Sequence, residues 1–86
     1  MQDFLAAFDA LPLGSFRARY ADKAWQVSRT DLAGGKAQKL VAHEPGGPGY
    51  VSLNLYRLAS GARPKPCEMP EAEAVAFVLG VVPDLT

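Results

Sequence analysis

The sequence predicts an α+β fold, in which a five-stranded antiparallel β-meander carries an N-terminal and a C-terminal helix packed on one face. Four turn signals divide residues 14–69 into five short segments of alternating apolar and polar residues. The turn signals are Ala21-Asp22-Lys23, Ala33-Gly34-Gly35, Pro45-Gly46-Gly47-Pro48-Gly49 and Ser60-Gly61. Turns this short join antiparallel neighbours, because a parallel crossover needs a dozen or more residues. The length, 86 residues, predicts a single domain over residues 1–86.

Helical spacing is found on both sides of the strand region. The apolar residues of the first segment follow the pattern of one helix face, and they are Phe4, Leu5, Phe8 and Leu11. Pro12 ends this helix. A second helix is expected from Pro70, with Glu71 in its first turn, where negative charge is favoured, and with Gly80 as its stop.

The strands are predicted over about residues 15–21, 24–30, 36–42, 50–58 and 62–67. Strand alternation sorts their side chains onto two faces. The face under the helices is expected to hold Phe16, Trp25, Val51 and Leu53, and the opposite face Arg17, Arg19, Gln26, Ser28, Asn54 and Tyr56. Pro64 and Pro66 cannot donate to a ladder, so the fifth strand is expected at an edge. The strand pattern fits both an open sheet and a sheet that closes partly into a barrel.

The net charge is zero, but the charges are unevenly distributed. All nine basic residues lie within residues 14–69, together with only four of the nine acidic residues. The strand region therefore carries nine minus four, or +5, and the flanking helical segments carry the remaining −5. A basic surface of this kind favours an anionic partner. The alternative is that the basic strands pair with the acidic helix ends, because surface charges usually do no specific work.

Composition limits the cellular setting and the chemistry. Cys67 is the only cysteine, which excludes a disulfide within the chain and a cysteine zinc cluster. The first residues lack the basic region of a secretory signal, and the longest apolar run, residues 74–83, is too short to span a bilayer. We therefore expect a cytoplasmic protein with no membrane partner.

Two short motifs predict no cofactor and no metal. His43-Glu44 is one histidine beside one carboxylate, which is too few ligands for a metal site. Gly34-Gly35-Lys36 is not a phosphate-binding loop, because Lys36 is followed by Ala37 and by a strand instead of a helix. The two glycines are better explained by the positive φ angles of a tight hairpin.

The basic and aromatic strand face is the most usable feature for function. Arg17, Arg19, Lys39 and Arg57 could line phosphates, while Tyr50, Tyr56 or Trp25 could stack on bases. We expect a small binding or interaction module, monomeric or homodimeric, whose partner is a protein or a nucleic acid. The predicted ligand-binding residues are Arg17, Arg19, His43, Asn54 and Tyr56.

Cys67 supports an alternative function, a thiol-dependent redox enzyme of the sulfoxide-reducing kind. Cys67 lies just before the predicted second helix, and a helix N-terminus favours the thiolate. A nucleophile also needs a base, and His43 is the only histidine. The Gly-Cys-Phe-Trp motif of methionine sulfoxide reductases is absent, and so is a resolving cysteine. A small buried apolar residue is the competing interpretation of Cys67.

Several stretches together resemble a family of short uncharacterised bacterial proteins. They are residues 16–29, Ala33-Gly34-Gly35-Lys36, Lys39-Leu40-Val41-Ala42, residues 50–56, Gly61 and Pro66-Cys67-Glu68-Met69-Pro70. The resemblance covers nearly the whole chain. It implies a compact cytoplasmic bacterial domain, and it transfers no activity and no functional residues to this sequence.

Overall fold

The computed structural model describes residues 2–58, 61–66 and 69–84, and it confirms an α+β fold with an antiparallel sheet. The chain order is α1 (Gln2–Ala10), β1 (Gly14–Tyr20), β2 (Lys23–Leu32), the 3-10 turn η1 (Ala33–Gly35), β3 (Ala37–His43), β4 (Tyr50–Leu58), β5 (Gly61–Pro66), α2 (Glu71–Gly80) and β6 (Val82–Pro83). The strands pair in the order β5-β4-β3-β2-β1-β6. Since β5 and β6 occupy opposite edges, the sheet is open and is not a barrel.

The described part of the chain has six strands where the sequence predicts five. The sixth is β6, in which Val82 and Pro83 pair with Arg19 and Ala18 of β1. The chain leaves α2 in an extended conformation at Val81 (φ −70°, ψ 136°) and so runs directly along β1. A strand of two residues is too short to show alternation, which is why the sequence does not reveal it.

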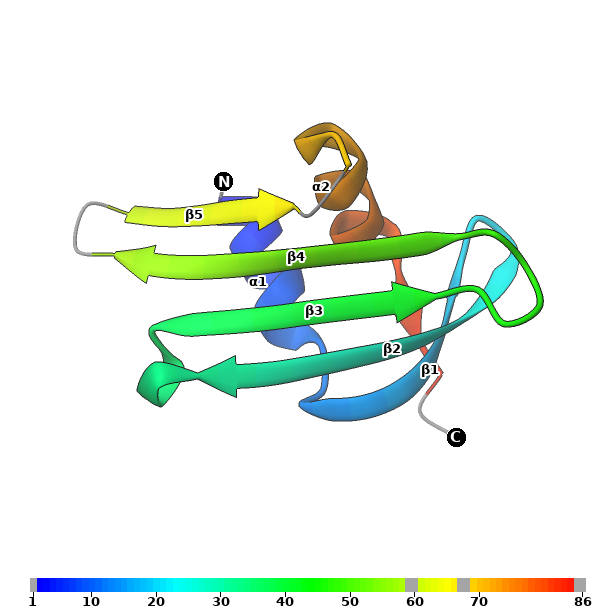
Figure 1. Ribbon diagram of the computed structural model, residues 1–86, viewed down its shortest axis with the longest axis horizontal. Helices are drawn as coiled ribbons and strands as arrows, with labels where there is room; N and C mark the ends of the chain where they lie inside the picture. Colours follow the sequence, from blue (N-terminus) through cyan, green and yellow to red (C-terminus); the bar gives the residue numbers. More distant parts are fainter. Residues whose placement is uncertain (1, 59–60, 67–68, 85–86) are drawn as a thin grey trace.

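Both helices cover the same face of the sheet, and Figure 1 shows them behind the strands. They contact each other, and α2 also packs against β4 and β5. The largest fully buried side chains between helices and sheet are Phe8, Phe77, Leu40, Leu53, Leu55, Val27 and Val78. Trp25, at 7% exposure, lies in this core, as strand alternation predicts. The core thus lies between the helices and one face of the sheet, and neither α1 nor α2 covers the other face.

Two turns fix how the strands pair. Ala21 and Asp22 join β1 to β2 with φ angles of 53° and 62°, which is the left-handed geometry of a tight hairpin turn. The loop between β3 and β4 passes close to the core at Gly49, where an added Cβ would lie 2.6 Å from Cη2 of Trp25. Only glycine therefore lets this loop lie against the indole ring.

A polar network fastens α1 to the sheet. Arg29 of β2 lies on the covered face at 7% exposure, and its Nη1 donates to the carbonyl oxygens of Leu11 (2.6 Å) and Phe8 (2.9 Å). Asp9 accepts a hydrogen bond from Arg57 and lies 3.8 Å from Nη2 of Arg29. The arginine therefore satisfies carbonyl groups that the end of a helix leaves without partners.

The network closes into a ring across three strands. Arg57 donates through Nε to Gln38 (2.8 Å), and Gln38 donates through Nε2 to Asp31 (2.8 Å). Asp31 in turn lies 4.0 Å from Nη2 of Arg29. Two arginines, two aspartates and one glutamine thus hold α1, β2, β3 and β4 together without a net charge.

Candidate binding face

The sheet face away from the helices, here called the open face, is the candidate functional site. Figure 1 looks directly onto it. The strand register assigns its described side chains: Ser15, Arg17 and Arg19 of β1; Ala24, Gln26, Ser28, Thr30 and Leu32 of β2; Ala37, Lys39, Val41 and His43 of β3; Tyr50, Ser52, Asn54 and Tyr56 of β4; and Lys65 of β5. None of these strand positions is an aspartate or a glutamate. At the β1 edge, however, Asp84 follows β6, and its backbone N–H donates to the carbonyl oxygen of Arg17 (2.8 Å), so one acidic residue lies beside the basic ones.

One row of side chains crosses four strands near the loop between β3 and β4. It consists of Arg17, Gln26, His43 and Tyr50, which follow one another in the cross-strand register. Gln26 donates through Nε2 to Oγ of Ser15 (2.8 Å) and to the carbonyl oxygen of Phe16 (3.3 Å). These two bonds hold the amide of Gln26 in place between the exposed side chains of Arg17 and His43.

A hollow of about 280 Å³ lies beside this row. Its lining residues are Arg17, Ala24, Trp25, Gln26 and Pro45. Pocket volumes for drug-sized ligands are roughly 300–1,000 Å³, so this hollow fits one small chemical group. Arg17 and Gln26 are the residues with polar side-chain ends among those at the open face that line it.

A second row joins β3, β4 and β5. In it Asn54 pairs with Lys39 on one side and with Lys65 on the other. Neighbouring strands are about 4.8 Å apart, so the two lysines start about 10 Å from each other across the amide. Both lysines are exposed and Asn54 is half-buried. This row thus presents one lysine on each side of a side chain that can form hydrogen bonds.

The predicted ligand-binding residues share the open face. Arg17 and His43 belong to the first row, and Asn54 lies between the two lysines. Tyr56 pairs with Ala37, one row further along. Arg19 is less central, because it pairs with Val82 at the β6 edge. The structure therefore places these residues on one face of the sheet, in separate rows and not in one cluster, and whether they bind a ligand stays a prediction.

The strand register also places Lys65 among the basic side chains of this face. The sequence pattern alone does not predict this position for Lys65. The alternation of β5 is obscured by Pro64 and Pro66, and the pairing partner of Lys65 depends on the length of the preceding turn. With the register known, Lys65 falls directly beside Asn54.

Two residues proposed for phosphate or base contacts lie on the other face. Arg57 points to the covered side, where Asp9 and Gln38 hold its guanidinium, so it cannot line phosphates on the open face. Trp25 is buried against Phe77 and Tyr20, with ring centroids 5.0 and 6.1 Å away, so it offers no stacking surface there. Both positions agree with the alternation of side chains in β4 and β2, which places Arg57 and Trp25 on the covered face.

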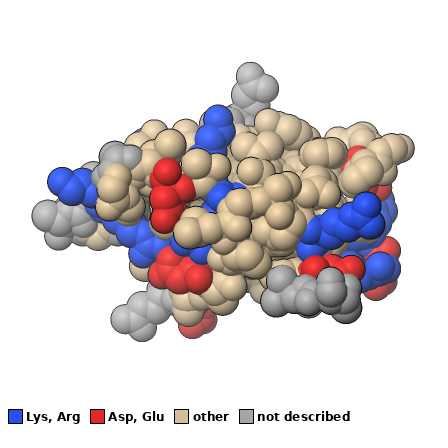
Figure 2. All heavy atoms as spheres, turned by 90° about the horizontal axis from the view of Figure 1, so that it is seen from below, with Lys and Arg blue, Asp and Glu red and all other residues tan. Residues whose placement is uncertain are grey.

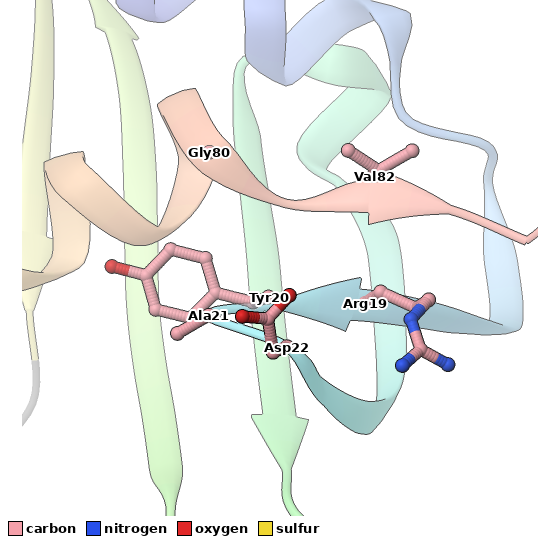
Figure 3. A pocket seen from close by; sticks show the side chains of 6 residues that line it. All are labelled: Arg19, Tyr20, Ala21, Asp22, Gly80 and Val82. Carbon is pink, nitrogen blue, oxygen red and sulfur yellow. The ribbon is translucent and has the colours of Figure 1, made fainter.

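A second pocket lies beside the hairpin between β1 and β2 and is shown in Figure 3. Its volume is about 180 Å³, and it is lined by Arg19, Tyr20, Ala21, Asp22, Gly80 and Val82. The polar ends of Arg19, Tyr20 and Asp22 point in three different directions (Figure 3). Because they do not converge on one point, this pocket is a weaker candidate than the open face.

The side of the molecule that is seen from below in Figure 2 differs from the open face in its charge pattern. Viewed from below, lysine and arginine side chains lie next to aspartate and glutamate side chains at both ends, with mostly uncharged surface between them (Figure 2). One such contact is the ion pair between Lys23 and Glu44, at 3.8 Å. On this side of the molecule, basic and acidic side chains are therefore mixed.

The remaining predicted chemistry has little support in the structure. Cys67 lies outside the described residues, so the thiol alternative is untested. Among residues 2–58, 61–66 and 69–84, no group of three or more histidine, cysteine, aspartate or glutamate side chains is arranged to hold a metal ion. Within the same ranges no helix has the length and apolar character needed to cross a bilayer.

Comparison with known proteins adds no relative. No family model, no curated protein and no solved structure matches this chain. The function therefore has to be argued from the open face itself.

Proposed function

We propose that this protein is a small binding module that holds an anionic partner on its open face. The supporting observation is a contrast between two sets of basic side chains. Lys23, Arg29 and Arg57 have carboxylate partners within 4 Å. On the open face, Lys39 and Lys65 have no carboxylate at that distance among the described residues.

Pairing of basic strands with acidic helices accounts for Arg29 and Arg57, which contact Asp9 of α1, but it does not account for the lysines of the open face. The acidic residues near the basic ones already have partners, since Asp9 and Asp31 contact Arg29 and Glu44 contacts Lys23. The chain as a whole has no net charge, so general electrostatic attraction does not make it a polyanion binder. Cations gathered on one face give a local positive potential, which favours an anionic partner at that face.

Retention on a heparin column tests this proposal. Lys39→Glu and Lys36→Glu change the net charge equally and lie three residues apart, but Lys36 is outside the strands and off the open face. We expect the wild-type protein to be retained at low salt, and Lys39→Glu to elute at a clearly lower salt concentration than Lys36→Glu. Equal elution of the two variants, or no retention of the wild type, would contradict the proposal.

A further inference from the structure

We infer that the anionic partner of the open face is a single-stranded nucleic acid. This inference rests on the proposed function and adds the chemical class of the ligand. Its basis is the arrangement of two exposed tyrosines around the lysine row. Tyr50 and Tyr56 are 59% and 38% exposed, so both side chains are accessible from solvent.

The two tyrosines stand on the same face of one strand. They are six residues apart on β4, which at about 3.3 Å per residue separates them by about 20 Å. Asn54, with Lys39 and Lys65 beside it, lies between them in the strand. The two rings therefore lie on either side of the lysine row, whose cations are on the neighbouring strands β3 and β5, and proteins that bind single strands likewise combine stacking surfaces with phosphate contacts.

The chemistry of the other polyanions fits this pattern less well. Polyphosphate, heparin and an acidic peptide would use the cations but leave both tyrosine rings in water. A duplex keeps its bases stacked inside the helix, so its bases cannot lie on Tyr50 or Tyr56. A single strand offers both parts, because its phosphates can meet the lysines while its unpaired bases stack on the rings.

The hollow beside Arg17 adds a place for one group of the same ligand. Its volume is about 280 Å³, and Arg17 and Gln26 are among its lining residues. Gln26 and His43 lie between Arg17 and Tyr50 in the register, so Arg17 is three strand spacings, about 14 Å, from the first stacking surface. A guanidinium binds phosphate in a fixed two-point geometry, so we assign one phosphate of the strand to Arg17 at this hollow.

The decisive test uses the unmodified protein and three ligands of equal length. Fluorescence anisotropy is measured with labelled oligonucleotides of about eight nucleotides, a length within the range of known single-strand sites. The three are a normal single strand, an abasic single strand with the same phosphates, and a duplex of the same sequence. We expect the abasic strand and the duplex each to bind at least about tenfold more weakly than the normal strand, because stacking contributes roughly that factor per base.

Variants locate the contact and control for folding. Tyr56→Ala is expected to weaken binding of the normal strand by about tenfold and to leave the abasic strand unchanged. Leu79→Ala removes an exposed apolar side chain from α2, on the other side of the molecule, and should change neither affinity. Thermal unfolding of both variants shows whether each is folded at the temperature of the binding assay.

The outcomes separate this inference from the proposed function. Equal binding of normal and abasic strands, with heparin retention still sensitive to Lys39→Glu, would overturn the nucleic-acid assignment and keep the anion-binding face. Equal binding of duplex and single strand would overturn it in the same way. A polyglutamate peptide that competes as strongly as the oligonucleotide would point to an acidic protein instead. Loss of both oligonucleotide and heparin binding would overturn both proposals.

Discussion

Arg29 Nη1 donates to the carbonyl oxygen of Leu11 over 2.6 Å and so joins the middle of β2 to the end of α1. The same guanidinium lies 4.8 Å from the ring centroid of Phe8, which places a cation over an aromatic face. The helix is therefore held by a charged group in the core as well as by its apolar side chains.

Replacing Arg29 by methionine is expected to destabilise the fold by about 2–4 kcal/mol. The change removes the arginine donor from the buried carbonyl group of Leu11, leaves that of Phe8 with the Leu11 N–H alone (3.1 Å), and takes one of two cationic or amide partners from Asp9 and from Asp31. Urea unfolding followed by circular dichroism measures it. Arg19→Met, at an exposed position, should change the free energy of unfolding by less than about 0.5 kcal/mol. A similar small loss for Arg29→Met would show that the network does not stabilise the protein.

Gly49→Ala is expected to destabilise the protein by about 1–3 kcal/mol, because the new Cβ would meet the Trp25 ring and force the loop or the ring to move. Thermal unfolding gives the loss, and the fluorescence of Trp25, the only tryptophan, reports whether its surroundings change. Pro48→Ala, in the same loop but exposed, is the control. An unchanged melting temperature for Gly49→Ala would mean that the loop does not press on the indole.

Trp25→Phe should destabilise the protein less than an ordinary core truncation. The indole Nε1 is buried and has no hydrogen-bond partner among the described residues, so removing it removes an unsatisfied donor along with some apolar contact. We expect a loss below about 2 kcal/mol, against about 2–5 kcal/mol for Leu53→Ala. Denaturant titrations of the two variants decide the order, and a larger loss for Trp25→Phe would imply that Nε1 does have a partner.

The salt dependence of oligonucleotide binding should fall when lysines of the open face are removed. Each phosphate contact on a single strand contributes about −0.7 to the slope of log K against log salt concentration. Lys39→Ala combined with Lys65→Ala is therefore expected to reduce the slope by about 1.4, while Lys36→Ala leaves it unchanged. Anisotropy titrations at several salt concentrations measure the slopes, and parallel lines for all three proteins would exclude both lysines as phosphate contacts.

Cys67→Ser is expected to leave oligonucleotide affinity within about twofold, because binding through cations and aromatic rings requires no thiol. The same variant tests the alternative function. A thiol-dependent enzyme would contain a Cys67 that reacts with a thiol probe well below the pH at which an ordinary cysteine reacts. Rapid reaction at low pH, together with reduction of a sulfoxide substrate that Cys67→Ser abolishes, would support the enzyme over the binding module.

Much of the fold was predictable because β1, β2 and β4 alternate clearly and because glycine marks the turns. Alternation also places Arg29 in line with Trp25 and Val27 on the covered face. The sequence gives no reason to bury it, since the acceptors that satisfy its guanidinium are carbonyl groups brought near by the packing of α1. A buried charge of this kind is visible only after the tertiary structure is known.

The sequence predicts on which face of the sheet the residues of the candidate site lie, but it does not predict which of them are neighbours across strands. Period-two alternation assigned Arg17, Asn54 and Tyr56 to one surface. Which residues adjoin across strands depends on register, and a shift of one residue would have removed Lys65 from beside Asn54. The lysine row on which both proposals depend is thus a product of turn geometry, which sequence patterns specify poorly.

The two edges of the sheet limit how these molecules can associate. Pro64 and Pro66 lie two residues apart in β5, so their nitrogens face the same direction, and an incoming strand finds no donor at either position. At the other edge, β6 offers only two residues for pairing. Growth of the sheet from molecule to molecule by strand pairing is therefore disfavoured at both edges, which keeps the width of the open face fixed.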